Sequence, residues 1–351
     1  MTESNINEVA EKALQVVLNQ INGVKGKNRP SVLKIGRLGD IKCIKTPVIS
    51  SGSLALDKAL GVGGIARGRF VELYGAESSG KTTLALEIIA ECQRQGGTAA
   101  FLDAEHALDM TYAREIGVTE ALLISQPDSG DEVMEIIDQL VRSGLVRLIV
   151  IDSVAALVTR AELEGEVTDV HMGRLARLMS QSLRRFAGLC AKADTTLLFI
   201  NQTRQNLSPY APPITTTGGN ALKFYTSQRI EIARKEPLKN GDDIYGSTTR
   251  VKVIKNKVAP PFKIAFFNII FGKGIDKFAD LLSVAVEDNI IVKSGSWFAY
   301  KEETIAQGFD GAMEYFKNNP EKFIEVKKAV LEKISNNQEV VEEEKDAESK
   351  D

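Results

Sequence analysis

The amino-acid sequence predicts an α/β protein that has a mostly parallel central sheet, an N-terminal helix and a small α+β unit at the C-terminus. Two observations predict this fold. From about residue 69, apolar segments alternate with helical ones, and several apolar segments, such as LIVID and LLFIN, are continuous, as in strands covered on both faces. Near residue 275 this alternation gives way to short mixed segments, which indicates a second, smaller domain.

The N-terminal segment, residues 1–38, is predicted to contain an amphipathic helix at 5–21, because apolar residues recur there at intervals of three and four. The stretch NGVKGKNRPS that follows is rich in Gly, Lys and Asn and indicates a linker. Such a helix could fold back on its own domain or dock on a neighbouring molecule, and its residues favour neither arrangement.

The central domain is predicted to span residues 39–275. Its strands are expected at Phe70–Tyr74, Ala99–Asp103, Ala121–Ser125, Leu148–Asp152, Thr196–Asn201, Arg229–Ala233 and Arg250–Ile254. A C-terminal domain, residues 276–337, should contain a helix at Ala279–Glu287, short strands within Ile290–Tyr300 and helices at 309–317 and 321–334. The acidic tail, 338–351, should be disordered, since its last ten residues hold six acids, two lysines and no large apolar residue.

The composition excludes several classes of protein. No run of 18 apolar residues exists, which argues against a membrane-spanning helix, and the polar, acidic N-terminus is unlike a secretory signal, so we expect a cytoplasmic protein. Three cysteines and two histidines are too scattered for a zinc site. A net charge of −3 does not favour a nucleic-acid partner, so any DNA site should be a local basic surface.

The segment GAESSGKT, Gly75–Thr82, has the spacing G-x-x-x-x-G-K-[ST] and stands between a predicted strand and a predicted helix. Glycines let backbone N–H groups surround phosphates, and the helix N-terminus adds partial positive charge. Lys81 supplies a cation for the β- and γ-phosphates. We therefore expect ATP to contact Gly75, Ala76, Glu77, Ser78, Ser79, Gly80, Lys81, Thr82 and Thr83.

A Mg²⁺ site is expected beside this loop. In the pattern, the hydroxyl of Thr82 is one ligand and a carboxylate at the end of a nearby strand is the other. Asp152 ends the apolar run LIVID and occupies this place, although a single acid at a strand end is usually an ordinary loop residue. Together with the phosphate loop, Thr82 and Asp152 predict a metal site.

Hydrolysis also requires a group that orients or deprotonates water. Glu105 closely follows the strand predicted at Ala99–Asp103, which places it at the carboxyl edge of the sheet, where ligands bind in such folds. On spacing alone, Glu77 and Asp103 are alternatives.

Two features favour a DNA-binding surface. In the predicted helix at 171–189, four arginines fall on one side and apolar residues on the other, a pattern that an ordinary solvated face also has. The long polar segment at 203–220 directly follows a core strand and carries Arg204 for phosphate and Tyr210 for base stacking. The arginines of the helix are Arg174, Arg177, Arg184 and Arg185.

The sequence resembles the RecA recombinase family over nearly its whole length. The segments that carry the resemblance are GAESSGKTTLALEIIA, FLDAEHALDMTYAR, LIVIDSVAAL, AELEGEVTDVHMG, LLFINQTR, TTTGGNALKFY and VKVIKNKVAPPF. The resemblance implies a P-loop NTPase core of the RecA-like type, in a DNA-dependent ATPase that forms helical filaments on single-stranded DNA. It also implies homologous pairing with double-stranded DNA, strand exchange in repair, and help in the self-cleavage of a damage-response repressor.

The resemblance assigns roles around ATP. It gives Glu105 the role of the catalytic glutamate and Gln202 that of a γ-phosphate sensor, which act with Lys81. Two further pairs are similar to nucleotide-binding residues of the family. Asp109 and Tyr112 resemble the pair that contacts adenine, and Lys255 and Lys257 resemble lysines that reach the ATP of the adjacent subunit.

The resemblance also implies two DNA-binding loops, at Glu162–Asp169 and Thr203–Asn220. The N-terminal helix resembles one that docks on a neighbouring subunit. The C-terminal domain resembles one that gathers duplex DNA, with an autoinhibitory tail. The expected DNA contacts are Arg174, Arg177, Arg184, Arg204, Gly218, Gly219 and Asn220.

Three stretches depart from the family pattern: NGVKGKNRPSVLKIG after the first helix, the proline-containing SPYAPPI of the second loop, and Phe271 where a tyrosine is common. Two other functions remain alternatives. A hexameric DNA-unwinding motor shares this core, but it should lack the docking helix. A filament scaffold that binds ATP without useful hydrolysis is disfavoured by the intact set of Lys81, Thr82, Asp152 and Glu105.

Overall fold

The computed structural model describes residues 16–17, 46–165, 173–205, 214–301 and 303–348, without the side chains of 205, 214 and 337–348. The chain divides into two units, residues 1–45 and 46–351. Of the helix predicted at 5–21, only Val16 and Val17 are described, and both are helical. The linker after it, the end of the first predicted DNA loop and residues 206–213 of the second, with Tyr210, lie outside the described residues.

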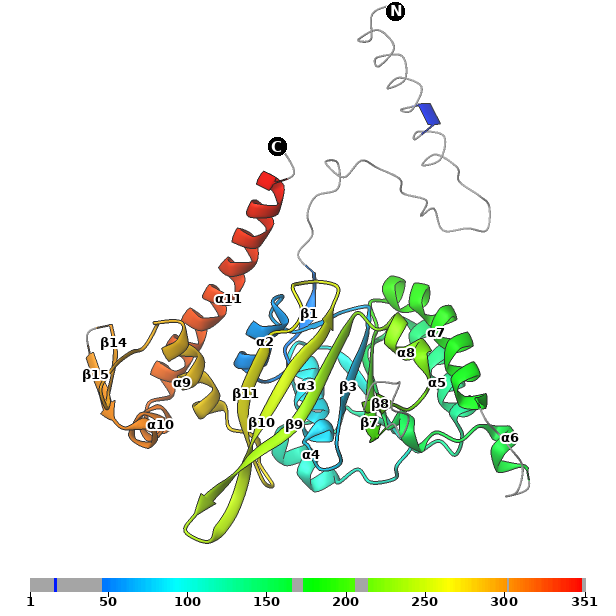
Figure 1. Cartoon of the computed structure of the whole chain (residues 1–351), viewed down its shortest axis with the longest axis horizontal. Coiled ribbons are helices and arrows are strands. Elements are labelled where there is room, and N and C mark those ends of the chain that lie inside the picture. Colours follow the sequence, from blue (N-terminus) through cyan, green and yellow to red (C-terminus); the bar gives the residue numbers. More distant parts are fainter. Residues whose placement is uncertain (1–15, 18–45, 166–172, 206–213, 302, 349–351) are drawn as a thin grey trace, which may run out of the picture. The chain divides into compact units, whose positions relative to one another are not determined.

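The second unit is built on one large sheet with the strand order β12-β11-β10-β9-β3-β7-β6-β4-β5 (Figure 1). The strands from β9 to β5 are parallel, and β10, β11 and β12 continue the sheet antiparallel beyond β9. The predicted α/β fold with a mostly parallel core is therefore confirmed. The strands are β3 (Phe70–Gly75), β4 (Thr98–Asp103), β5 (Leu123–Ser125), β6 (Val146–Asp152), β7 (Thr196–Gln205), β9 (Gln228–Asn240), β10 (Asp243–Asn256), β11 (Ile264–Ile270) and β12 (Gly274–Ile275).

Helices cover both faces of the sheet. Side chains alternate along β7, so that Leu198 and Ile200 pack on one face and Leu197 and Phe199 on the other, which explains the continuous apolar run. Figure 1 shows α5, α7 and α8 together on the second face. The first face is covered by α2 (Leu54–Leu60), α3 (Lys81–Arg94) and α4 (Met110–Ile116), and the second by α5 (Gly130–Ser143), α7 (Arg174–Ala193) and α8 (Asn220–Tyr225).

Several elements differ from the sequence prediction. The strand expected to end at Ala233 continues to Asn240 through charged residues and a proline, because β9 and β10 pair as a ribbon that extends past the neighbouring strands (Figure 1). Strand β11 was not predicted, and it has apolar side chains at its exposed as well as its buried positions. The short elements are β1 (Val48–Ile49), β2 (Ile65–Ala66), β8 (Ile214–Thr216), the 3-10 turn η2 (Val154–Ala156) and α6 (Arg160–Leu163).

The C-terminal part has an apolar core of its own, which includes Leu281, Phe298, Phe316 and Val330. Strand β15 was not predicted. The tail also differs from the prediction, because α11 continues as a helix to Glu348, through residues such as Glu and Lys that have high helix propensity. The elements are α9 (Lys277–Glu287), β13 (Val292–Ser294), β14 (Trp297–Tyr300), β15 (Glu303–Gln307), α10 (Phe309–Asn318) and α11 (Pro320–Glu348). In the described part of the chain, none of the helices is long and apolar enough to cross a bilayer.

Buried polar contacts attach α9 to the core. The carboxyl group of Glu87, on α3, accepts hydrogen bonds from the Ile275 amide at 2.9 Å and from Lys277 Nζ at 2.6 Å. On α9 itself, Asp280 accepts a hydrogen bond from the amide of Leu54, the first residue of α2, at 2.5 Å and so helps to cap that helix. Both carboxyl side chains are almost fully buried, so this junction is held by specific contacts rather than by apolar packing alone.

Candidate nucleotide and DNA sites

The phosphate loop connects the end of β3 to the start of α3. A side chain at Gly75 would place its Cβ 2.1 Å from the carbonyl oxygen of Ile232 on the adjacent strand, and Gly80 has a φ of +95°. Both positions therefore require glycine, the first for close approach and the second for its left-handed backbone. The predicted strand–loop–helix context of the motif is present.

Lys81 begins α3 and points back into the loop. Its Nζ atom donates to the carbonyl oxygens of Ala76 at 2.7 Å and Gly75 at 3.3 Å, and the residue is 8% exposed. Burial lowers the pKa of Lys81, while the charges of Asp152, Glu105 and Glu77 oppose this shift. A buried cation surrounded by loop carbonyls and carboxylates is suited to exchanging these partners for phosphate oxygens.

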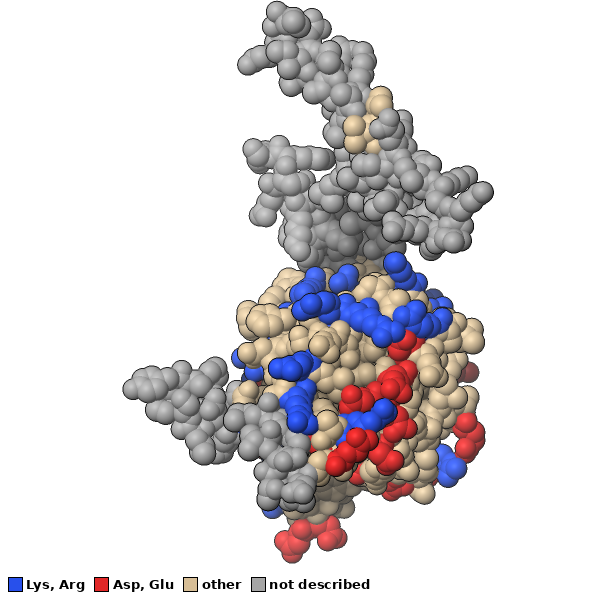
Figure 2. Space-filling view, turned by 90° about the vertical axis from the view of Figure 1, so that its right-hand side faces the viewer, with Lys and Arg blue, Asp and Glu red and all other residues tan. Residues whose placement is uncertain are grey.

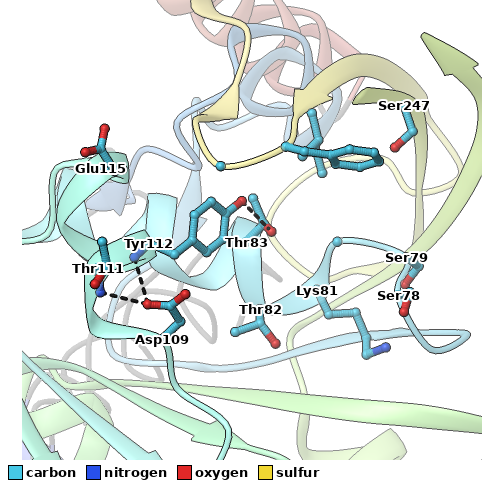
Figure 3. A pocket seen from close by; sticks show the side chains of 14 residues that line it. Ser78, Ser79, Lys81, Thr82, Thr83, Asp109, Thr111, Tyr112, Glu115 and Ser247 are labelled. Atoms are coloured by element: carbon cyan, nitrogen blue, oxygen red, sulfur yellow. Dashed lines mark hydrogen bonds between the residues drawn. The ribbon is translucent and has the colours of Figure 1, made fainter. Parts of the chain in front are cut away.

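A cavity of about 550 Å³ opens beside the loop. In Figure 3, Tyr112 and Thr83 point toward one another, and their hydroxyl oxygens are 3.0 Å apart. Asp109 caps α4 by accepting from the Thr111 amide at 2.8 Å and the Tyr112 amide at 3.1 Å, which fixes the ring at the cavity wall. The lining residues are Ser78, Ser79, Gly80, Lys81, Thr82, Thr83, Asp109, Thr111, Tyr112, Glu115, Ser247, Ile269, Phe271 and Gly272.

Three residues of the predicted phosphate loop do not line this cavity. Gly75, Ala76 and Glu77 line a separate cavity of about 550 Å³ next to β8 and β9. Sequence reasoning did not find Ser247, Ile269 or Gly272, because they come from β10, β11 and the turn after β11 and are adjacent to the phosphate loop only in the folded protein.

The two predicted metal ligands are in contact. Thr82 Oγ1 donates to Asp152 Oδ2 at 2.7 Å. The pKa of Asp152 is raised to about 6, mainly by burial and also by the charges of Glu105 and Asp103, while the Thr82 hydrogen bond and Lys81 oppose the rise. A buried carboxyl group beside other acids favours a bound cation, and a carboxylate with a hydroxyl fits the oxygen preference of Mg²⁺.

Glu105 connects the predicted metal site to Gln202. One of its carboxyl oxygens, Oε1, accepts from the Ser153 hydroxyl, directly after Asp152, and from Gln202 Nε2 at 3.0 Å. Its alternatives are placed differently. Asp103 is buried, and its carboxyl oxygens accept hydrogen bonds from the backbone amides of Ala107 and Leu108 at 3.2 Å, so they stabilise the turn after β4. Glu77 is exposed on the phosphate loop.

The cationic stripe of α7 is present as predicted. All four arginines are exposed, while the opposite side of the helix is buried through Met179, Leu183, Phe186 and Cys190. Arg185 pairs with Asp138 of α5 at 2.8 Å. Figure 2 shows that, on this side of the molecule, Lys and Arg side chains gather apart from a group of Asp and Glu side chains. DNA contact by this stripe stays a prediction.

The described ends of the second predicted DNA loop pair with each other. Arg204, near the end of β7, lies opposite Thr215 of β8. Gly218 and Gly219 have φ of +86° and +75°, and a Cβ at either would meet η2 or α7 within 2.9 Å. These glycines therefore let the chain pass close to the helix before Asn220 begins α8, a structural role that is compatible with DNA contact.

Lys255 is the second-last residue of β10, and Lys257 directly follows that strand. Lys255 Nζ donates to the carbonyl oxygens of Lys223 at 2.7 Å and Phe224 at 3.1 Å, at the end of α8. Burial and the nearby charge of Lys257 lower the pKa of Lys255. Phe224 is 73% exposed, so Lys255 stands beside a large apolar side chain that faces outward.

Comparisons with known proteins identify the family. Residues 12–276 match the RecA N-terminal domain and residues 279–335 match the RecA C-terminal domain. Protein RecA of Desulforapulum autotrophicum is 54% identical over 326 residues, which cover 92% of each chain. Protein RecA of Nostoc punctiforme is 55% identical over 326 residues, covering 92% of this chain and 89% of that one.

The chain belongs to the RecA family. It therefore has the RecA recombinase function and is a DNA-dependent ATPase. ATP binding, DNA binding and filament formation come with the family, and so does a part in recombination, repair and the damage response. The resemblance found in the sequence is therefore confirmed.

Proposed function

We propose that this RecA protein hydrolyses ATP at Lys81, Thr82, Asp152 and Glu105 and passes the state of that site through Gln202 to the second DNA loop. The observation that carries the proposal is the pair of hydrogen bonds on Glu105, which joins the residue after Asp152 to the residue before the loop. Both the Ser153 hydroxyl and Gln202 Nε2, the latter at 3.0 Å, donate to the same carboxyl oxygen of Glu105. A catalytic acid that shares a hydrogen bond with the start of a DNA loop links the two activities.

Each residue has a task that its position supports. Lys81 would bind the β- and γ-phosphates, and Glu105 would orient the attacking water and accept its proton. Thr82 and Asp152 would hold Mg²⁺, which when bound supplies positive charge against the phosphates. Tyr112, fixed by Asp109, would stack on the adenine ring.

The partners follow from the same proposal. Single-stranded DNA would bind the two loops and the α7 arginines, and residues 276–337 would gather duplex DNA. Residues 1–38 would dock on the next subunit of the filament, and 338–351 would restrain duplex binding. We also propose a cytoplasmic site of action and help in the self-cleavage of a damage-response repressor.

Phosphate release with and without single-stranded DNA tests the activity, together with negative-stain microscopy in a slowly hydrolysed ATP analogue. We expect stimulation by DNA and open helical filaments. Closed rings would support the hexameric motor, and filaments without DNA-stimulated release would support the scaffold. Either result contradicts the proposal.

Lys255 and Lys257 are proposed to act on the ATP of the adjacent subunit, as an arginine finger does in other P-loop enzymes. Two variants test this: Lys255→Ala with Lys257→Ala, and Glu105→Gln. In a mixed filament some interfaces combine an intact Glu105 with intact lysines from the neighbour, so the mixture should hydrolyse more ATP than the sum of its parts. A merely additive rate in filaments that demonstrably co-assemble would place the lysines outside the neighbour's site.

A further inference from the structure

A carboxyl group is buried in the strand that leads to the phosphate loop. Glu72 lies on β3, three residues before Gly75, and is 0% exposed. Its Oε2 atom accepts from Arg229 Nε at 2.5 Å, and its Oε1 atom accepts from Asn201 Nδ2 at 3.0 Å. Burying a carboxyl group is unfavourable unless partners satisfy both of its oxygens, and an apolar residue would fill the same space without that cost. A buried acid at this position therefore suggests a role other than packing.

Asn201 uses its whole amide group. Besides the bond to Glu72, its Nδ2 atom donates to the carbonyl oxygen of Thr217 at 2.9 Å, and its Oδ1 atom accepts from the Gln202 amide at 2.9 Å. Gln202 stands just before the second DNA loop, and Thr217 lies in its returning arm, after β8. One fully buried side chain therefore holds both arms of the loop.

The same residues reach the nucleotide site along two routes. Through its side chain, Gln202 contacts Glu105 at 3.0 Å. Through its backbone, Gln202 is opposite Gly75 in the parallel pairing of β3 and β7. A displacement of Gln202 or of β3 therefore acts on Asn201, whose remaining donor is bound to Thr217.

We propose that Glu72 and Asn201 are a pair of positioning residues that transmit the state of the nucleotide site to the returning arm of the second DNA loop. The proposal rests on the function proposed above for Gln202 and the loop. Glu72 fixes the orientation of the Asn201 amide, and Asn201 carries the change across to Thr217. Neither residue contacts substrate in this scheme.

A charge-conserving exchange isolates the contact with Thr217. In the double variant Glu72→Gln with Asn201→Asp, the new amide can donate to the new carboxylate and still accept from Arg229, and the acid can still accept from the Gln202 amide. Of these hydrogen bonds only the one donated to Thr217 is lost, and the bond from Arg229 now goes to a neutral oxygen. Asn201→Ser is a second variant, which leaves the Glu72–Arg229 pair intact and removes the amide.

Thr195→Val is the matched control. Thr195 is also fully buried, and its hydroxyl donates to the Val146 carbonyl oxygen at 2.7 Å, but it stands before the start of β7, at the opposite end from the loop. The control therefore removes a buried hydrogen bond next to the same strand without touching either arm of the loop.

The readout is the ratio of two dissociation constants for single-stranded DNA, measured without nucleotide and with a slowly hydrolysed ATP analogue. Coupling of this kind usually gives ratios of about 5 to 150. We expect both test variants to bring the ratio down to about one, with analogue affinity in the absence of DNA retained. Thr195→Val should keep the ratio of the unchanged protein.

A ratio in the test variants equal to that of Thr195→Val would overturn the proposal. A loss of analogue affinity without DNA would also overturn it, because the pair would then support the phosphate loop itself. If the unchanged protein shows a ratio of one, the proposed role of Gln202 and the loop has failed, and that result is distinct from a failure of the pair. Thermal unfolding of each variant separates these outcomes from a loss of fold. If the exchange variant does not fold, the result for Asn201→Ser is the one that tests the proposal.

Discussion

The nucleotide end of the sheet and the arginine-bearing side of α7 handle charge in opposite ways. At the nucleotide end, Lys81 and Asp152 are 8% and 5% exposed and have fixed partners. Along α7 the arginines are exposed to solvent. Buried charges interact strongly because little water screens them, whereas exposed charges are weakened by water and salt. Single substitutions should therefore have large effects in the first region and small, additive ones in the second.

Glu105→Gln should give the largest effect. The amide keeps the shape of the side chain but cannot accept a proton, so hydrolysis should fall by a factor of about 10² or more while ATP and DNA binding are retained. Phosphate release is the measurement. The control is Glu77→Gln, the same substitution at an exposed position of the phosphate loop. Normal turnover in Glu105→Gln together with loss in Glu77→Gln would mean that the other carboxylate activates water.

Lys81→Ala should weaken ATP binding by about 1.5–3 kcal/mol, because a charge-assisted contact to phosphate is removed. Fluorescence titration with a labelled ATP analogue measures this. Lys192→Ala, an exposed lysine near the end of α7, is the control and should bind the analogue normally. Near-normal affinity in Lys81→Ala would contradict both the assignment and the contrast between the two regions.

Asp152→Asn should change how stability depends on pH in the absence of nucleotide and Mg²⁺. The folded-state pKa of Asp152 is about 6, above its ordinary value of 3.8, so between these values the folded protein binds a proton that the unfolded chain does not. The free energy of unfolding therefore falls as pH rises through this window. Asp152→Asn should remove a fall of roughly 1–3 kcal/mol between pH 4 and pH 7. Urea unfolding of both proteins, compared at each pH, cancels the contributions of other acids, and parallel curves would show that Asp152 is not shifted.

The arginines of α7 should give the smallest effects. Arg177→Ala should weaken single-stranded DNA binding a few-fold at low salt and lower the slope of log K against log salt by about 0.7, as for one phosphate contact. Arg185→Ala should do less, since Arg185 already pairs with Asp138 at 2.8 Å. Equal effects of the two substitutions, measured by fluorescence anisotropy across salt concentrations, would show that the ion pair does not determine which arginine meets DNA.

The candidate nucleotide site could be predicted from the sequence because its chemistry lies in short local patterns. The phosphate loop, Asp152 and Glu105 each follow a strand, and parallel strands bring their carboxyl ends to one edge. Sequence reasoning could not find Ser247 or Ile269, because they lie on β10 and β11, antiparallel strands whose place beyond β9 is set by the pairing of the sheet.

The partners of Glu72 were hidden for a related reason. An acid in an apolar strand is unusual in the sequence, but its contact with Asn201 depends on β3 and β7 being neighbours, and the alternation of strands and helices did not predict that order. The tail was also misjudged. Its acidity indicated disorder, whereas the helix propensity of the same residues agrees with α11 continuing to Glu348.

The attachment at Glu87 gives the C-terminal domain an unusual anchor. Its contacts are made to α3, the helix that starts at Lys81, and Glu87 is one helical turn beyond Thr83. A short helix moves as a rigid rod, so any tilt that a phosphate imposes on its first turn is carried along the rod to Ile275 and Lys277. The C-terminal domain is thus joined to the sheet through β12 and, through Glu87, to the helix that begins at the phosphate loop.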